Sequence, residues 1–214
     1  MARCALRKID PSLDLSGHFF EAEQLPVPFD GAAIFGREAP LELEVGTGKG
    51  LFLVTASADR PEHNFLGCEI SRGYARFAAA RLTRLGRSNA VVVHDDAQRL
   101  LRSLPGRLAT AVHVYFPDPW WKKRHHKRRI MNNEFLAQVH RILELGGSFH
   151  FWTDVEEYFQ VTLGVIAEAT GFQGPLDVPE RSATHAMDYA THFERKKRLL
   201  GLAVHRAEFR RVLQ

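Results

Sequence analysis

Short apolar runs recur through the middle of the chain, and each is followed within two residues by a glycine or an acidic residue. They occupy residues 41–45, 64–68, 90–93, 110–116 and 148–152. Their length and their content of β-branched and aromatic residues are typical of buried strands. We therefore expect five central strands whose carboxyl ends lead into glycines or acids.

Segments with helical spacing of apolar residues separate these strands. One helix is predicted from Leu51 and a second over residues 71–85. Asn132 or Asn133 can cap a third helix, and a fourth is predicted over residues 155–169. Strands that alternate with helices at this pitch predict an α/β fold with a doubly wound, mostly parallel sheet.

Both ends of the chain depart from this pattern. Prolines and glycines interrupt any regular spacing in residues 1–38, so we expect an N-terminal extension followed by one domain over residues 39–214. After Phe172, a polar loop leads to an apolar run at residues 199–204, which predicts a last strand. We expect that strand to lie antiparallel at one edge of the sheet.

The composition and the charge of the chain indicate what kind of partner it binds. The 214 residues suit one sizeable domain, and 45% hydrophobic with 25% charged residues is ordinary for a folded protein. The formal charge is 29 − 25 = +4, but without the six Lys and Arg of residues 122–129 it becomes 23 − 25 = −2. Positive charge concentrated in one segment indicates a phosphate-bearing partner.

The cysteines and the hydropathy of the chain indicate its cellular compartment and its class. Cys4 and Cys68 stand far apart, and they suggest neither a disulfide framework nor a metal site. The longest apolar runs are far too short to span a bilayer. We expect a soluble cytoplasmic protein that has no membrane partner and binds no metal.

The first candidate for chemistry is the motif Glu44-x-Gly46-x-Gly48-x-Gly50, placed between a strand and a helix. Leu51 stands where the dinucleotide-binding fingerprint needs a small residue, and the spacing of a phosphate-binding P-loop is wrong. An acid followed by alternating glycines is the pattern of S-adenosylmethionine enzymes, whose ligand carries an ammonium group and no pyrophosphate. A tight strand-to-helix turn without a ligand is the structural alternative.

Further acids end the next two strands. Glu69 lies about 20 residues beyond the glycines, where doubly wound folds place a carboxylate on ribose hydroxyls. Asp96 ends the third strand and would face the adenine edge, with Asp95 as a competing choice. A solvated helix cap is the alternative for each acid singly.

A second constellation follows the fourth strand. Asp118 stands between Pro117 and Pro119, which restrict the backbone on both sides of the carboxylate. An acid, a proline and an aromatic residue form a similar corner in amino-methyltransferases. Trp120 or Trp121 could stack on a nucleobase, or could pack against the helix layer instead.

A run of cations comes directly after the tryptophans. No acidic residue is interleaved in it, as the ion pairs of an ordinary helix surface would require, and phosphate binding is therefore favoured. We name as the basic ribbon its six cationic residues, Lys122, Lys123, Arg124, Lys127, Arg128 and Arg129.

With these motifs assembled, the chain resembles the bacterial tRNA (guanine-N7-)-methyltransferases over about residues 41 to 200. The resemblance implies a Rossmann-like class I S-adenosylmethionine-dependent methyltransferase fold and methyl transfer to N7 of a guanine at position 46 of the tRNA variable loop, forming 7-methylguanosine. We expect a monomer or a homodimer, and the sequence does not decide between the two. The matching pieces are the glycine motif with Glu44, Glu69-Ile70, Asp96-Ala97, Phe116-Pro117-Asp118-Pro119-Trp120 with the basic ribbon, Thr153-Asp154-x-Glu156-x-Tyr158 and Thr191-x-Phe193-Glu194.

The resemblance also assigns roles to individual residues. Glu44, Gly46, Gly48, Glu69, Asp96 and Asp118 would bind S-adenosylmethionine. Asp118 would also be the catalytic residue. Lys122, Asp154, Thr191, His192, Phe193 and Glu194 would hold the tRNA, although Thr191 with Glu194 is also the pattern of a helix capping box. His192 and Trp121 depart from the residues usual in the family.

The chemistry of the target atom limits what Asp118 can do. Guanine N7 is an acceptor without a proton, so attack on a methyl group needs no general base. We expect Asp118 to position the guanine and to counter positive charge on its ring. Two alternatives stay open: methylation of an exocyclic amine of adenine or of a protein glutamine, and an RNA-binding module without activity.

Overall fold

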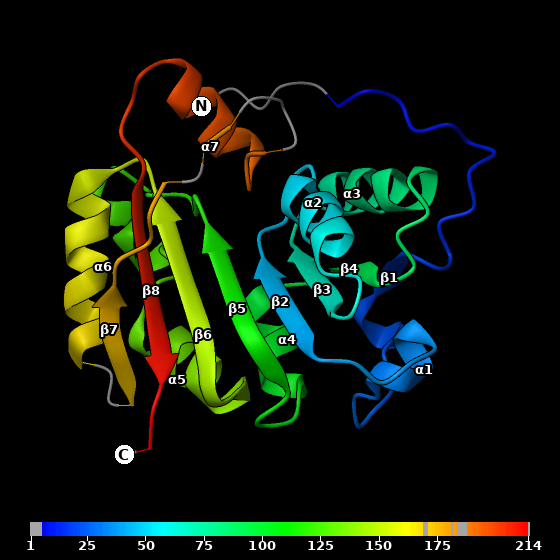
Figure 1. Ribbon diagram of the computed structural model, residues 1–214, viewed down its shortest axis with the longest axis horizontal. Coiled ribbons are helices and arrows are strands. Elements are labelled where there is room, and N and C mark those ends of the chain that lie inside the picture. The colour runs from blue at the N-terminus through cyan, green and yellow to red at the C-terminus, as the bar shows by residue number, and fades with distance from the viewer. Residues whose placement is uncertain (1–5, 169–170, 181, 184–187, 214) are drawn as a thin grey trace.

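A single twisted sheet of eight strands forms the centre of the protein (Figure 1). The structure is a computed structural model, and it describes residues 6–168, 171–180, 182–183 and 188–213. The strands lie in the order β1-β4-β3-β2-β5-β6-β8-β7. Their bounds are Phe19–Glu21 (β1), Leu41–Val45 (β2), Asn64–Glu69 (β3), Ala90–His94 (β4), Ala109–Tyr115 (β5), Leu143–Thr153 (β6), Phe172–Leu176 (β7) and His205–Arg211 (β8).

Strands β1 to β6 are parallel, and β8 runs antiparallel to both β6 and β7. This confirms the mostly parallel, doubly wound sheet with an antiparallel pair at one edge. The order of the strands reverses between β2 and β5, because the chain leaves β2 toward β3 and β4 and later returns beside it as β5. Ligands of such sheets bind where the carboxyl ends of the strands diverge at this reversal.

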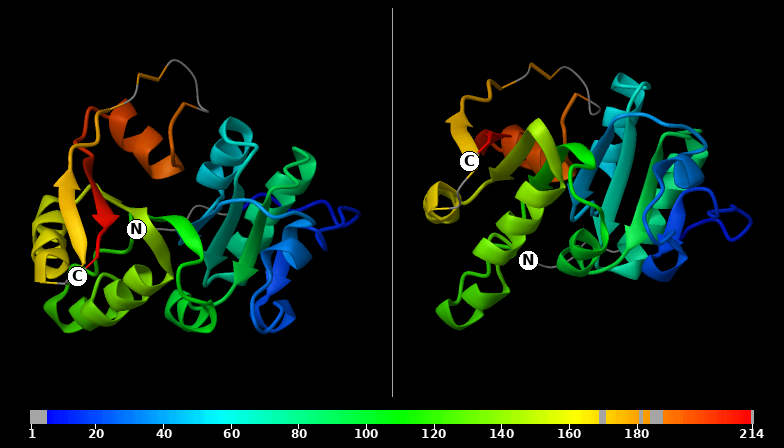
Figure 2. Two further views of the ribbon diagram at one scale, coloured as in Figure 1. Left: turned by 60° about the horizontal axis from the view of Figure 1, so that its bottom comes forward. Right: turned by 90° about the horizontal axis from the view of Figure 1, so that it is seen from below.

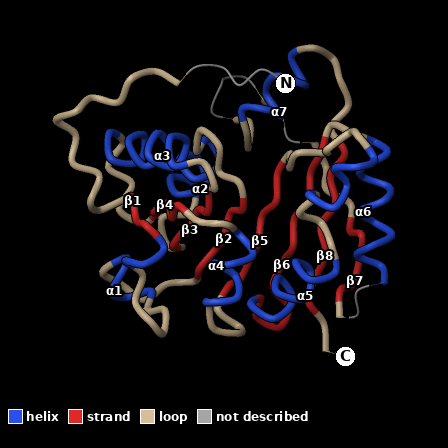
Figure 3. The backbone as a smooth tube through the Cα atoms, turned by 180° about the vertical axis from the view of Figure 1, so that it is seen from behind, coloured by secondary structure: helices blue, strands red, loops and turns tan. Residues whose placement is uncertain are grey.

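Helices cover both faces of the sheet, as the two hydrophobic clusters show. Figure 2 gives the twist of the sheet from two directions, and Figure 3 shows α4 and α5 against its rear face. The front face carries α2 (Leu51–Asp59) and α3 (Arg72–Arg84). The rear face carries α4 (Ala97–Ser103), α5 (Asn133–Ile142) and α6 (Glu156–Glu168). The remaining helices are α1 (Gly31–Phe35), α7 (His192–Leu199) and the 3-10 turns η1 (Ala22–Gln24) and η2 (Lys123–Arg128).

Successive side chains along β3 point to opposite faces of the sheet and enter different hydrophobic clusters. Phe65 is fully buried among side chains of α2 and α3, whereas its neighbour Leu66 is fully buried in the cluster on the other face. Burying one such side chain contributes about 2 kcal/mol to folding. Between them and the site, Gly67 leaves room for the glycine motif: a Cβ there would lie 2.4 Å from Thr47 Cγ2 and 2.6 Å from Leu53 Cδ1. The glycine motif therefore packs directly against strand β3.

The structure changes the prediction for both ends of the chain. Part of the N-terminal extension joins the sheet, because β1 pairs in parallel with β4. The strand predicted over residues 199–204 is wrong: α7 ends at Leu199, and β8 begins only at His205. The apolar side chains of this segment, Leu199, Leu200 and Leu202, are exposed, so their run did not mark a buried strand.

Candidate functional site

The predicted site residues gather at the carboxyl ends of the parallel strands. The glycine motif follows β2, and the Pro-Asp-Pro corner follows the adjacent strand β5. Helix α7 lies over the same edge of the sheet (Figure 1). Segments far apart in the sequence are thus brought to the position where the strand order reverses.

Backbone hydrogen bonds fix the glycine motif in place. The amides of Gly46 and Thr47 donate to the carbonyl of Cys68 at 2.8 and 3.2 Å. Gly46, Gly48 and Gly50 have φ of 79°, 53° and 68°, a region that residues with a Cβ adopt at a cost. Gly50 has a second reason, since a Cβ there would lie 2.7 Å from Ala78 Cβ. The first two glycines shape the loop, and the third lets α2 approach α3.

Glu44 is a buried carboxylate, and one of its oxygens has no hydrogen-bond partner in the described part of the chain. Its side chain is 2% exposed, and among the described residues nothing bonds to Oε2. Burial, with a smaller contribution from Glu69, raises the pKa of Glu44 to about 8. The hydroxyl of Thr47 is also buried and has no partner among the residues that the structure describes. An ammonium group beside Glu44 would supply the missing partner, and the amino acid end of S-adenosylmethionine carries one.

Glu69 closes the glycine motif from the neighbouring strand. Its Oε2 accepts a hydrogen bond of 2.9 Å from the Gly48 amide, and its Oε1 accepts one of 2.8 Å from the Ser71 amide. Each oxygen of a carboxylate can accept two hydrogen bonds. Glu69 therefore keeps capacity for ligand hydroxyls while it holds the loop against the sheet.

The two aspartates after β4 have different environments. Asp95 is buried, and its Oδ1 accepts hydrogen bonds from the Arg99 guanidinium and the Asp96 amide. Asp96 is exposed and caps α4, with Oδ1 accepting from the amides of Gln98 and Arg99. The geometry favours Asp96 over Asp95 as a ligand contact, because only the side chain of Asp96 reaches solvent.

The Pro-Asp-Pro corner is a strained turn with Asp118 exposed at its tip. Phe116 and Trp120, on either side of it, have positive φ of 52° and 45°, which is costly for aromatic residues and is found where surrounding contacts impose it. The Phe116 amide donates to the Trp152 carbonyl at 2.8 Å, and Arg129 Nε donates to the Pro119 carbonyl at 2.7 Å. The carboxylate of Asp118 is therefore presented on a backbone held from two sides.

The two tryptophans after this corner differ in their surroundings. The Arg128 guanidinium lies over the Trp120 ring, 5.1 Å from its centroid, and the His125 ring forms a T-shaped contact with it at a centroid distance of 5.7 Å. Trp121, by contrast, is 64% exposed. The face of Trp120 is thus already used inside the protein, while Trp121 is open to a ligand.

The basic ribbon forms η2 and splits into two groups. Lys122, Arg124, Lys127 and Arg128 are exposed, and the structure shows no ion pair for them among the described residues. Arg129 is half-buried: besides Pro119, its guanidinium lies over the Tyr158 ring at 4.7 Å and contacts His126. Arg129 thus braces the corner, although it was expected to steer phosphates. The side chain of Lys123 lies outside the described part of the structure.

Helix α7 carries the Thr-His-Phe-Glu segment to the site. Thr191 caps the helix by accepting a 3.0 Å hydrogen bond from the Glu194 amide. The side chain of Glu194 is buried, accepts from the Ala190 amide at 2.7 Å and pairs with Arg198 and Arg206. Glu194 therefore secures the helix from within. A direct contact with tRNA would have to compete with these ion pairs.

The outer residues of the segment contact other parts of the site. The Phe193 ring stacks on Phe116 at 5.9 Å, and Lys197 forms a 2.5 Å ion pair with Asp154 after β6. His192 Nε2 lies 3.2 Å from Arg81, and burial together with Arg81 lowers the pKa of His192 to about 4. An uncharged imidazole can accept the hydrogen bond from the guanidinium.

The sequence did not reveal two residues of this site. Arg81 of α3 donates to the Lys49 carbonyl at 2.7 Å, so it links the glycine motif to α7 through His192. Thr47, within the glycine motif, carries a buried hydroxyl that has no partner among the described residues. Neither residue has a signal in the sequence, since Arg81 looks like one of several arginines on a helix and Thr47 occupies a variable place in the motif.

Comparison with known proteins agrees with this geometry. A family model described as "Putative methyltransferase" matches residues 38–207. A protein from Rhodopirellula baltica, named tRNA (guanine-N(7)-)-methyltransferase, is 46% identical over 99% of this chain and 80% of its own length. A protein of the same name from Shewanella amazonensis is 38% identical over 87% of this chain and 79% of its own.

Solved structures show the same fold at low identity. The aminoglycoside resistance methyltransferase NpmB1 aligns with a TM-score of 0.59 at 18% identity, covering 83% of this chain and 90% of its own. A SAM-dependent O-methyltransferase from Thermotoga maritima aligns with a TM-score of 0.54 at 15% identity, covering 86% of this chain and 65% of its own. These likenesses concern the fold alone, which is that of Rossmann-like methyltransferases.

Proposed function

The chain belongs to the tRNA (guanine-N7-)-methyltransferase family, and from this premise we propose that its site transfers a methyl group from S-adenosylmethionine to N7 of a guanine in tRNA. The buried, unpartnered carboxyl of Glu44 at the glycine motif carries the proposal for the cofactor. The exposed Asp118 on the adjacent strand end carries it for the target base. We assign the target to position 46 of the variable loop.

The cofactor residues divide its recognition between them. Glu44, with the hydroxyl of Thr47, would hold the ammonium group, and Gly46 and Gly48 let the backbone approach it closely. Glu69 would accept the ribose hydroxyls, and Asp96 would face the adenine edge. S-adenosylmethionine supplies an electrophilic methyl group on a sulfonium. The uncharged state of Glu44 ends when an ammonium group binds beside it, because opposite charge favours the carboxylate.

Asp118 would position the guanine and would not serve as a general base. Guanine N7 attacks with a lone pair, so the residue does not need to act as a base. The carboxylate would accept hydrogen bonds from N1–H and the exocyclic amine, and would stabilise the positive charge that grows on the ring during transfer. The strained backbone at Phe116 and Trp120 holds it ready for this contact.

The tRNA would be held by side chains on both sides of Asp118. Lys122, Arg124, Lys127 and Arg128 would bind phosphates, with Lys123 as a further candidate. Trp121 would stack on a base, since Trp120 is covered by Arg128. On the other side, Asp154 and the segment Thr191 to Glu194 would bound the substrate.

One chain supplies every residue of this site, so we propose that it acts as a monomer or as a homodimer of independent sites. Within the described residues, no helix is long and apolar enough to cross a membrane. A tRNA substrate is consistent with activity in the cytoplasm.

Identification of the product tests the function directly. Unmodified tRNA is incubated with the protein and S-adenosylmethionine labelled in its methyl group, and the digested nucleosides are separated by mass spectrometry. We expect label in 7-methylguanosine, from the variable loop. Label in a methylated adenosine would show the exocyclic-amine reaction instead. If the cofactor raises the melting temperature but no tRNA is labelled, the cofactor assignment survives and the tRNA assignment fails.

A further inference from the structure

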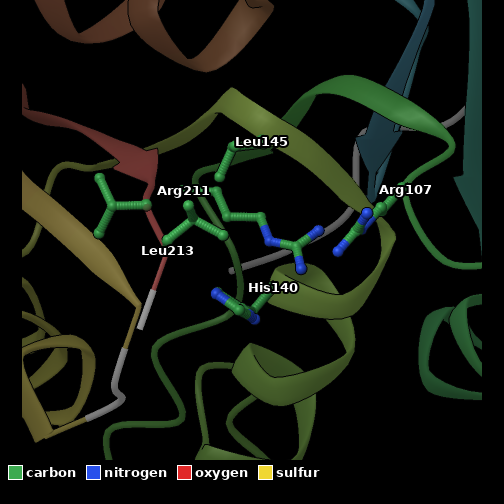
Figure 4. A pocket seen from close by; sticks show the side chains of 6 residues that line it. Arg107, His140, Leu145, Arg211 and Leu213 are labelled. Carbon is green, nitrogen blue, oxygen red and sulfur yellow. The ribbon is translucent and has the colours of Figure 1, made fainter.

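A cavity lies at the end of the strands opposite to the cofactor residues. Its volume is about 170 Å³, and it is lined by Arg107, His140, Leu145, Arg211, Val212 and Leu213 (Figure 4). It is formed where β5 and β6 begin and β8 ends. Strand β5, which lies beside β2, has 7 residues, so this cavity is roughly 20 Å from the carboxyl ends of the strands.

The lining of this cavity is basic and contains no acidic side chain. Figure 4 shows the guanidinium of Arg211 directed toward Arg107, with the imidazole of His140 beside them. The neighbouring Arg210 is different, because it has an acid of its own: it pairs with Glu208 at 2.6 Å. Two guanidinium groups face one cavity without a counter-charge among its lining residues.

The buried donors of Arg211 are only partly satisfied. One terminal nitrogen donates to the Leu143 carbonyl, but Nε is buried without a partner among the described residues. Burial, followed by the charge of Arg107, lowers the pKa of Arg211. Two guanidinium groups at one cavity repel each other, and an oxyanion between them would supply the missing counter-charge and accept hydrogen bonds from their N–H groups.

The backbone places Arg107 at the cavity in spite of local strain. Its φ is 55°, in the left-handed region that arginine rarely adopts. The turn is held by the end of α5, since the amides of Arg107 and Leu108 donate to the carbonyls of Arg141 and Ile142 at 3.0 and 2.7 Å. This conformation is fixed by the main chain, so the side chain can be replaced without removing these bonds.

We propose that this cavity is a binding site for a phosphate-type oxyanion, held by Arg107 and Arg211 at the end of the strands remote from the methyl-transfer site. Guanidinium groups bind phosphate and carboxylate oxygens through paired N–H donors. Two sources have this chemistry: a backbone phosphate of a bound RNA, or a free phosphate or phosphate ester. The site is independent of the function proposed for the other end.

Titration with inorganic phosphate tests the site. The melting temperature and the heat of binding are measured as phosphate replaces chloride at constant ionic strength. The variant Arg107→Asn removes the charge but tolerates positive φ, and Arg210→Gln removes an equal charge from the adjacent position in β8. We expect saturable binding to the wild type and to Arg210→Gln, and roughly ten-fold weaker binding to Arg107→Asn.

Two results would overturn the proposal: no saturable phosphate binding to the wild type, or equal binding to the wild type and Arg107→Asn. A second arm measures the affinity of unmodified tRNA for the same proteins. Roughly ten-fold weaker tRNA binding by Arg107→Asn identifies the anion as an RNA phosphate. Unchanged tRNA binding together with weakened phosphate binding identifies a free phosphate or phosphate ester. Binding of S-adenosylmethionine to Arg107→Asn verifies that the variant is folded.

Discussion

Three carboxylates at the site lie in different surroundings, and each environment suits a different task. Glu44 is buried with a raised pKa, so at neutral pH it is largely protonated until a cation arrives. Glu69 accepts two backbone hydrogen bonds, which hold its carboxylate in position. Asp118 is exposed on a strained turn, where a nucleobase of the tRNA can reach it. Environment, more than residue type, separates their roles.

The raised pKa of Glu44 predicts that cofactor binding releases a proton. Below about pH 8 the free protein holds that proton, and an ammonium group beside the carboxylate displaces it. Titration calorimetry at pH 6.5, in buffers with different ionisation enthalpies, should show release of about one proton. Affinity should rise by close to ten-fold per pH unit between about pH 5.5 and 7.5.

Glu44→Gln supplies the control for this measurement. The variant should bind S-adenosylmethionine more weakly and without proton release. Binding to the wild type that releases no proton and is independent of pH would show that Glu44 does not meet the ammonium group.

Trp121 is predicted to stack on a base of the tRNA. Trp121→Ala should weaken tRNA binding by about ten-fold, since a stacked base contributes roughly 1–3 kcal/mol, while Trp121→Phe should retain most of the affinity. The melting temperature should change little, because the side chain is 64% exposed. Fluorescence anisotropy with labelled tRNA measures the affinity, and a Trp121→Ala variant that binds as well as the wild type would exclude the contact.

Single residues were predictable where their chemistry is written in the local pattern. Glu44, Glu69 and Asp118 stand beside glycines, at strand ends or between prolines, and the structure brings them to one edge. We expected Asp96 to face the ligand, with Asp95 as a competing choice, and the local pattern alone did not decide between them. The choice depends on Arg99, one turn into the following helix, which pairs with the buried carboxylate and leaves the other exposed.

Among the secondary-structure elements, helix α7 connects the side of the site near α3 with the Pro-Asp-Pro corner and the end of β6. It contacts α3 through His192, the Pro-Asp-Pro corner through Phe193 and the end of β6 through Lys197. Its base is joined to β8 by the ion pair of Glu194 with Arg206. These four contacts fix the position of α7 over the site.

Glu194→Ala is therefore predicted to destabilise the protein by about 3 kcal/mol, because it leaves two arginines without their buried partner. Glu180→Ala is the matched control: Glu180 pairs with the same arginines but its side chain is 52% exposed, so the cost should be under about 1 kcal/mol. Urea unfolding measures both. Undiminished stability of Glu194→Ala with loss of tRNA binding would instead assign Glu194 to the substrate.

The central strands and helices were predictable because hydrophobic periodicity dominates in a sheet buried on both faces. The edges were not. Strand β1 has only three residues, and β7 contains Gly174-Pro175, which interrupts the alternation that marks a strand. Helix α7 is mostly charged, and its start is marked by the Thr191 cap more than by any apolar stripe.

Across the whole molecule, positive charge is concentrated beside the carboxyl ends of the strands, while the rest of the chain has a formal charge of −2 by the arithmetic 23 − 25. Four exposed cations of the basic ribbon have no ion pair within the described residues. Charge at this position attracts a polyanion to the site without requiring a particular base sequence. Recognition of the target base then depends on the contacts around Asp118.

The salt dependence of tRNA binding tests this distribution. The affinity should fall linearly with salt concentration on logarithmic axes, and Arg124→Gln or Lys127→Gln should each reduce the slope by about 1. Arg102→Gln removes an exposed cation of α4 that pairs with Glu134, and it should leave the slope unchanged. Equal slopes for all three variants and the wild type would show that tRNA does not lie on the basic ribbon.

The most direct test of the account is single-turnover methyl transfer by Asp118→Asn, with cofactor and tRNA both saturating. We expect the rate constant to fall by at least about 100-fold, while binding of S-adenosylmethionine, measured by calorimetry, stays within a few-fold of the wild type. Such a result places Asp118 on the guanine during transfer. An unimpaired rate would contradict the account, since the corner after β5 would then not be the place where the methyl group is transferred.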